Sequence, residues 1–72
     1  MILTDGRHLV SDVSLSELHT FVKQLGFKRK WFQNNLRHPH YDLTTNRALI
    51  RAMKQGVKRV SIKELLKRMV KT

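Results

Sequence analysis

Three amphipathic segments of this chain begin at a hydroxyl residue that suits a helix N-cap, and two of them end at a glycine. A Ser or Thr side chain in this position accepts a hydrogen bond from a backbone N–H that the first helical turn leaves free. A glycine after the last turn adopts the left-handed conformation that ends many helices. The caps are Ser14, Thr44 or Thr45, and Ser61, with capping-box partners at Glu17 and Glu64, and the glycines are Gly26 and Gly56.

Apolar residues inside these segments recur at the three- and four-residue spacing of a helix face. Each face needs a partner to cover it, and a chain of 72 residues has room for one core. We therefore expect a single domain over residues 1–72. The expected core positions are Leu15, Leu18, Phe21, Val22 and Leu25 in the first helix, Ala48, Leu49, Ala52 and Met53 in the second, and Ile62, Leu65, Leu66, Met69 and Val70 in the third.

The segments outside the helices predict three short strands and one long loop. Residues 1–4 and 8–11 flank Asp5-Gly6, a pair that supplies the positive φ values of a tight hairpin turn. The same stretch is also consistent with a loop that places Asp5 and His8 at a site. Residues 57–61 predict a third strand. Residues 27–43 show neither the two-residue alternation of a strand nor the spacing of a helix, and they predict a loop. The expected fold is α+β, with an N-terminal β-hairpin and a third short strand packed against three helices in the order ββ-α-loop-α-β-α.

Positive charge is concentrated in the second part of the chain. Residues 23–72 contain fourteen Lys or Arg and two acids, a net charge of +12, whereas residues 1–22 contain one base and three acids, a net charge of −2. An ordinary solvated face carries both signs, and here acids are nearly missing. The imbalance therefore indicates a polyanionic or acidic partner, either nucleic acid or an acidic protein surface. A solvated face without a specific partner is the remaining interpretation.

The candidate phosphate-binding residues fall into two groups. The first is a basic triplet that precedes two aromatic residues, and the second is a stripe at helical spacing in the second helix. Trp31 is a candidate for stacking on the bases of a single strand, although both aromatic residues could instead belong to the core, as we expect for Phe32. The expected nucleic-acid contacts are Lys28, Arg29, Lys30, Trp31, Arg47, Arg51, Lys54 and Lys58.

Two histidines and a carboxylate lie within the five residues from His38 to Asp42. Such residues can bind a divalent metal or transfer protons. Their spacing matches no common metal motif, and no HxxxH or HExxH sequence is present. The candidate catalytic set is His40, Asp42 and His19, and the candidate metal ligands are these three with His8; Asp5 and Asp12 are further possibilities. The alternative, which we favour, is structural: Asp42 caps the second helix and His40 orders the loop, while His19 borders the first helix's apolar stripe.

Other functional classes find little support. The chain has no cysteine, which excludes a disulfide and a thiolate zinc site and fits a reducing compartment. No apolar run is long enough to span a membrane, and the first ten residues lack the pattern of a secretory signal. We found no nucleophile elbow, glycine-rich phosphate loop or cofactor motif, and a helix-turn-helix fits poorly because the first two helices are far apart.

Several short motifs follow one another along most of the chain. In order they are Leu9-Val10-Ser11-Asp12, Glu17-Leu18-His19, Lys30-Trp31-Phe32-Gln33, His40-Tyr41-Asp42-Leu43 and Arg47-Ala48-Leu49. Together they resemble a family of small uncharacterised proteins of bacteria and their phages, most specifically in the Trp-x-Gln and His-Tyr-Asp elements. This chain differs in having Ser16-Glu17 where paired acids are usual, a shorter first hairpin and more positive charge. The resemblance brings no activity, but it implies a compact cytoplasmic domain and directs attention to His19, His40 and Asp42.

These observations lead to one expected function and two rivals. The expected function is a small accessory protein that binds DNA or RNA through its basic second half, without a cofactor and without a membrane. The first rival is a phage-type regulator that docks on an acidic surface of a host protein, such as a component of the transcription machinery. The second is a metal-assisted phosphoester hydrolase, although we lean against an enzyme. The sequence does not indicate an oligomeric state.

Overall fold

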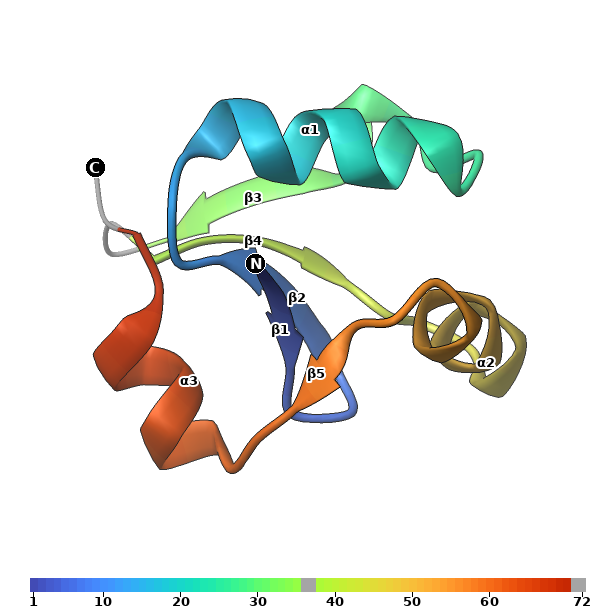
Figure 1. The fold of residues 1–72 in the computed structure, drawn as a ribbon. Helices are drawn as coiled ribbons and strands as arrows, with labels where there is room; N and C mark the ends of the chain where they lie inside the picture. The colour runs from blue at the N-terminus through green and yellow to red at the C-terminus, as the bar shows by residue number, and fades with distance from the viewer. Residues whose placement is uncertain (36–37, 71–72) are drawn as a thin grey trace.

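The computed structural model describes residues 1–35 and 38–70 and confirms the α+β class (Figure 1). Five strands form one sheet in the order β3-β4-β2-β1-β5, with β1 and β5 parallel and the other neighbours antiparallel. The helix α1 lies on one face of this sheet and α3 on the other (Figure 1). The elements are β1 (Ile2–Thr4), β2 (His8–Ser11), α1 (Leu15–Gln24), a 3-10 turn η1 (Arg29–Trp31), β3 (Phe32–Asn35), β4 (His38–Asp42), α2 (Asn46–Lys54), β5 (Lys58–Arg59) and α3 (Ile62–Arg68).

The N-terminal hairpin is confirmed, with a turn that differs from the two-residue turn that Asp5-Gly6 suggests. The strands β1 and β2 pair from Ile2↔Ser11 to Thr4↔Leu9. Gly6 has a φ of 104°, which a residue with a side chain rarely adopts. The Asp5 carboxylate accepts the backbone N–H groups of Arg7 and His8, both at 2.9 Å. The Asp side chain therefore closes the turn itself, as in an Asx turn.

The long loop predicted over residues 27–43 is wrong. Most of this segment forms η1 and a second antiparallel pair, β3 and β4, in which Phe32 lies opposite Tyr41 and Gln33 opposite His40. Pro39 lies within β4 although it has no N–H to donate, a property that usually keeps proline out of the middle of a sheet. It is tolerated because the pairing of β2 with β4 covers only His8↔Asp42 and Leu9↔Tyr41, so Pro39 lies beyond it.

The helix starts agree with the sequence. The side chains of Ser14, Thr45 and Ser61 accept N–H bonds from Glu17, Ala48 and Glu64, each at 3.1 Å. Thr45 is therefore the cap of α2, rather than Thr44. Three residues expected in the core are exposed, namely Met53 on α2 and Ile62 and Leu66 on α3.

The sheet has a separate apolar cluster on each face. Alternate residues of β1 and β2 point in opposite directions, so Ile2 and Leu9 pack with α1 and α2, whereas Leu3 and Val10 pack with α3. The first cluster also contains Tyr41 and Val57. Because the pattern of β4 alternates, His38, His40 and Asp42 lie on the α3 side of the sheet, opposite to Pro39 and Tyr41. No helix among the described residues is long and apolar enough to cross a membrane.

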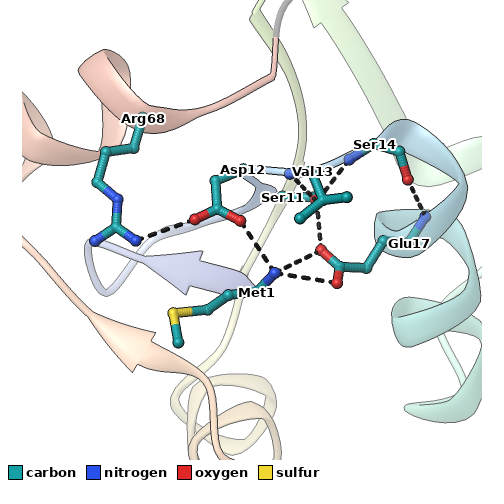
Figure 2. Close-up of polar contacts among 7 residues, drawn as sticks. All are labelled: Met1, Ser11, Asp12, Val13, Ser14, Glu17 and Arg68. Atoms are coloured by element: carbon teal, nitrogen blue, oxygen red, sulfur yellow. Dashed lines mark hydrogen bonds and ion pairs between the residues drawn. The ribbon is translucent and has the colours of Figure 1, made fainter.

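A polar network joins the chain start to α1 and α3 (Figure 2). The Met1 ammonium contacts the carboxylates of Asp12 and Glu17 at 2.9–3.0 Å, and Arg68 of α3 contacts Asp12 at 3.0 Å. The buried Ser11 hydroxyl donates to Glu17 and accepts the N–H groups of residues 13 and 14. Hydrogen bonds from Ser11 and the ammonium lower the pKa of Glu17, although partial burial opposes them. Asp12 and Glu17, two of the chain's five acidic residues, are thus paired around the N-terminus.

Candidate functional site: the Trp31 face and the His8–His40–Asp42 cluster

The structure brings part of the predicted basic set together around one exposed aromatic ring. Lys30, Trp31 and Asp42 line one hollow, and the adjoining hollow shares Trp31 and Asp42 and adds Arg47 and Arg51. Trp31 keeps 46 % of its surface exposed and contacts Phe27 edge-on, with ring centroids 5.6 Å apart. We call Lys30, Trp31, Arg47 and Arg51 the Trp31 face.

The other predicted contacts are more dispersed. Arg29 lies over the ring of Phe32, with its guanidinium carbon 5.4 Å from the ring centroid. Lys28 and Lys54 are exposed close in sequence to the Trp31 face but do not line its hollows. Lys58 lies in β5, at the edge of the sheet opposite to β3. Lys58 is therefore the predicted contact least compatible with one continuous surface.

Within residues 1–35 and 38–70, no carboxylate forms an ion pair with a cation of the Trp31 face, although Asp42 lines both of its hollows. Asp12, Glu17 and Glu64 form ion pairs with the N-terminal ammonium or with Arg68, whereas Asp5 and Asp42 contact histidine rings. A surface whose positive charges lack internal partners attracts an external anion. The acids concerned are Asp5, Asp12, Glu17, Asp42 and Glu64.

Next to this face, three residues of metal-binding types, two histidines and an aspartate, converge from two neighbouring strands. His8 lies opposite Asp42 in the β2–β4 pairing, and His40 lies two residues earlier on the same side of β4. The Nε2 atom of His40 is 3.3 Å from Asp42 Oδ1, and the Nε2 atom of His8 is 3.8 Å from the same oxygen. The two imidazole rings meet edge to face, with centroids 5.2 Å apart.

Each of the three side chains also has a hydrogen bond on the side that faces away from the other two. His8 Nδ1 lies 2.9 Å from Asp5 Oδ2, and His40 Nδ1 lies 2.7 Å from the carbonyl oxygen of His38. Gln33 donates its amide N–H to Asp42 Oδ2. Burial opposes ionisation of Asp5, but the His8 ring and two backbone N–H groups outweigh it, and the pKa of Asp5 is lowered. These hydrogen bonds thus fix the orientation of the three side chains.

The expectation that Asp42 caps the second helix is wrong. Thr45 supplies that cap, and Asp42 points instead toward His8 and His40. The reason is register: β4 continues to Asp42, so its side chain follows the alternation of the strand and projects from the sheet. His40 likewise belongs to a strand and not to a loop.

An apolar cleft of about 230 Å³ adjoins the two histidines on the side of α3. His8 and His40 form one wall of this cleft, and the exposed Ile62 and Leu66 belong to the other. Asp42 lies at the opposite end of the cluster, where it lines both hollows of the Trp31 face. The cluster therefore connects a basic surface to an apolar one.

Comparison with known proteins gives a family without an assigned activity. The family model described as "Protein of unknown function (DUF4031)" matches residues 5–72. This chain belongs to the DUF4031 family. No curated protein and no solved structure matches it. The resemblance to an uncharacterised family is confirmed.

In this DUF4031 chain, His19 is separated from the other candidate ligands. Its Nδ1 atom lies 2.8 Å from the Tyr41 hydroxyl, and its ring packs against Phe32 at a centroid distance of 4.7 Å. Tyr41 points to the α1 side of the sheet, away from His40 and Asp42. Burial and the nearby Arg29 guanidinium lower the pKa of His19, and burial raises that of Tyr41. The structure therefore does not bring His19 together with His8, His40 and Asp42.

Sequence reasoning missed two contributors to the DUF4031 cluster, the Gln33 amide and the His38 carbonyl. The Gln33 contact depends on the register of β3 against β4, and the His38 contact depends on the conformation of β4 itself. Neither can be deduced while residues 27–43 are taken as a loop. The available signal was the alternation of aromatic and polar residues in Phe32-Gln33 and His40-Tyr41-Asp42. Asp12, which the sequence left as a possible ligand, is bound to Met1 and Arg68 instead.

Proposed function

We propose that this protein binds nucleic acid through the Trp31 face. The observation that carries the proposal is the set of exposed cations around a half-exposed indole, with no carboxylate paired to them in the described part of the chain. Lys30, Arg47 and Arg51 would neutralise phosphates and release condensed counterions. A cytoplasmic accessory role, where nucleic acid is abundant, is part of the same proposal.

Trp31 supplies the contact that distinguishes nucleic acid from a simple polyanion. An exposed indole beside phosphate-binding cations can stack on a base, and every base offers such a face. The edge contact with Phe27 supports the ring without covering it. This arrangement favours single-stranded nucleic acid, or an end or loop whose bases are accessible, over an uninterrupted duplex.

The rival proposal is an acidic surface on another protein. It uses the same cations but needs no stacking, so Trp31 decides between the two partners. Loss of binding on removal of charge alone is expected for either partner. Weaker binding to a single strand on removal of the indole, with charge unchanged, is the result expected if Trp31 stacks on bases.

The test uses fluorescence anisotropy with labelled single-stranded DNA and RNA of mixed sequence at about 50 mM salt. The double variant Arg47→Ser, Arg51→Ser should weaken binding at least tenfold, and Trp31→Ala should weaken it about five- to a hundredfold, from about 1–3 kcal/mol of stacking. The matched control is Lys63→Ser, Lys67→Ser, which removes two exposed charges from α3 on the opposite face of the sheet. Equal effects of the two double variants would mean nonspecific charge attraction. No binding by the wild-type protein would reject the proposal and favour a protein partner.

A further inference from the structure

We propose that His8, His40 and Asp42 hold one divalent transition-metal ion of the zinc class. One ligand atom from each of the three residues lies within 4.8 Å of the other two. Nε2 of each histidine is directed toward Oδ1 of the aspartate, and we take these as the ligand atoms. Imidazole nitrogen and carboxylate oxygen are ordinary ligands of Zn²⁺ and of neighbouring ions such as Co²⁺ and Mn²⁺. The metal site is independent of the proposed nucleic-acid binding and can be tested without it.

The distances within the cluster fit a shared metal ion. Zinc lies about 2.0–2.1 Å from its nitrogen and oxygen ligands, so two ligands at a tetrahedral angle are about 3.4 Å apart. The two histidine nitrogens are 3.3 Å and 3.8 Å from the same carboxylate oxygen. Small rotations of the His8 ring would bring the longer distance into this range.

The hydrogen bonds behind the cluster favour a cation at its centre. A carbonyl or carboxylate oxygen accepts hydrogen bonds, so the Nδ1 atoms of His8 and His40 act as donors to Asp5 and to the His38 carbonyl. In each neutral ring, Nε2 then carries a lone pair. In that form, the one that binds a metal, both Nε2 lone pairs and the Asp42 oxygen are available to a cation placed between them.

The same contacts form the outer shell that metal sites usually need. A ligating histidine typically donates its other N–H to a carboxylate or a backbone carbonyl, which fixes the tautomer and the ring direction. Here Asp5 serves His8, the His38 carbonyl serves His40, and the Gln33 amide serves Asp42. The three ligands are therefore oriented before any ion binds, which reduces the ordering cost of binding.

The site is accessible, and three protein ligands leave a position for water. His8 and Asp42 keep about a third of their side-chain surfaces exposed, at 33 % and 36 %. Three protein ligands with one open position are the usual arrangement of catalytic zinc, which lowers the pKa of its bound water. The ion would also neutralise Asp42, whose charge otherwise opposes an anion in the hollows that it shares with Arg47.

If the Trp31 face binds nucleic acid as proposed, the bound strand lies beside this metal-bound water. The reaction class that fits is phosphodiester hydrolysis. The oxygen of the metal-bound hydroxide forms a bond to phosphorus, the bond from phosphorus to a sugar oxygen breaks, and that oxygen takes a proton from water. This step rests on the proposed function, whereas metal binding does not.

The first experiment measures Zn²⁺ and Co²⁺ binding to the full chain by isothermal titration calorimetry, with visible absorption as a second readout for Co²⁺. We expect one ion per chain. His40→Ala and Asp42→Asn should each weaken binding more than a hundredfold, and Asp5→Asn should weaken it about 10–100-fold through the outer shell. The matched control is His38→Ala, which removes an imidazole from the same face of β4 but keeps the carbonyl that His40 uses. Circular dichroism establishes that each variant is folded.

The outcomes separate the metal site from the activity. Absence of binding by the wild-type protein, or equal binding by the Asp42→Asn and His38→Ala variants, would overturn the metal site. The second experiment incubates labelled single-stranded DNA and RNA with the Zn²⁺- or Mn²⁺-loaded protein. We expect cleavage that a chelator stops and that Asp42→Asn abolishes while strand binding persists. Metal binding and strand binding without any cleavage would overturn the hydrolytic step alone.

Discussion

At the scale of single residues, consecutive aromatic side chains have different environments. Phe32 is partly buried and packs against the cluster on the α1 side, where its ring lies 5.5 Å from that of Tyr41. Trp31, one position earlier, is largely outside that cluster and borders the two basic hollows. The expectation that Phe32 belongs to the core is confirmed. Binding by Trp31 remains a prediction.

The Phe32→Ala and Trp31→Ala variants should therefore separate stability from binding. Removing the Phe32 ring from its packed environment should lower the free energy of unfolding by about 3 kcal/mol, the lower end of the usual range, because the ring is only partly buried. Removing Trp31 should cost less than about 1 kcal/mol of stability, as is usual for exposed positions, and mainly weaken nucleic-acid binding. Urea unfolding and anisotropy measure the two effects. A Trp31→Ala protein that loses stability as much as Phe32→Ala would assign the indole to the core.

His19 gives a pH-dependent contribution to stability. Its pKa in the folded protein lies below the ordinary value of 6.5, because of burial and the nearby Arg29 charge. As the pH falls through 6.5, the unfolded chain takes up the proton first, so the free energy of unfolding decreases until the folded form also becomes protonated. The His19→Gln variant should lose less stability than the wild type between pH 7.5 and pH 5.5. Parallel urea-unfolding series at these two pH values make the comparison, and identical losses in both proteins would contradict it.

At the scale of elements, the N-cap residues predicted the helices well, whereas the pairing of strands was harder to predict. Ser14, Thr45 and Ser61 act through hydrogen bonds to residues three positions later, so the chain itself contains the whole signal. The β3–β4 hairpin depends instead on cross-strand contacts such as Phe32 with Tyr41, which the sequence does not display. The missed register explains why Asp42 was expected at a helix cap. The sequence singled out His8 and His40 by residue type alone. The pairing of β2 with β4 is what brings them together.

The junction between β2 and α1 depends on the buried hydroxyl of Ser11. This hydroxyl accepts the N–H groups of Val13 and Ser14 and donates to Glu17 (Figure 2). The Ser11→Ala change would leave those N–H groups without their acceptor and should cost about 1–3 kcal/mol of unfolding free energy. Ser16→Ala, at an exposed position of α1, is the control and should change stability by less than about 0.5 kcal/mol. Equal urea midpoints for both variants would show that the Ser11 hydroxyl contributes little.

At the scale of the whole molecule, the distribution of charge follows from the partners of the five acidic side chains. Asp12 and Glu17 bind the N-terminal ammonium, and Asp12 and Glu64 bind Arg68. Of the remaining two carboxylates, Asp5 contacts His8, and Asp42 contacts His8 and His40. The Trp31 face consequently keeps its positive charge. The sequence predicted the excess of charge, and the fold adds that Lys30, Arg47 and Arg51 gather around Trp31 while Lys58 lies at the far edge of the sheet.

The most direct measurement is the salt dependence of binding to single-stranded nucleic acid between about 50 and 200 mM salt. Each phosphate contact contributes about −0.7 to the slope of log K against log salt concentration for a single strand. We predict a steep slope for the wild-type protein and a slope shallower by about 1.4 for Arg47→Ser, Arg51→Ser, two contacts having been removed. The Lys63→Ser, Lys67→Ser control should keep the wild-type slope. Binding that is insensitive to salt, or a slope that the two double variants change equally, would contradict a nucleic-acid interface at the Trp31 face.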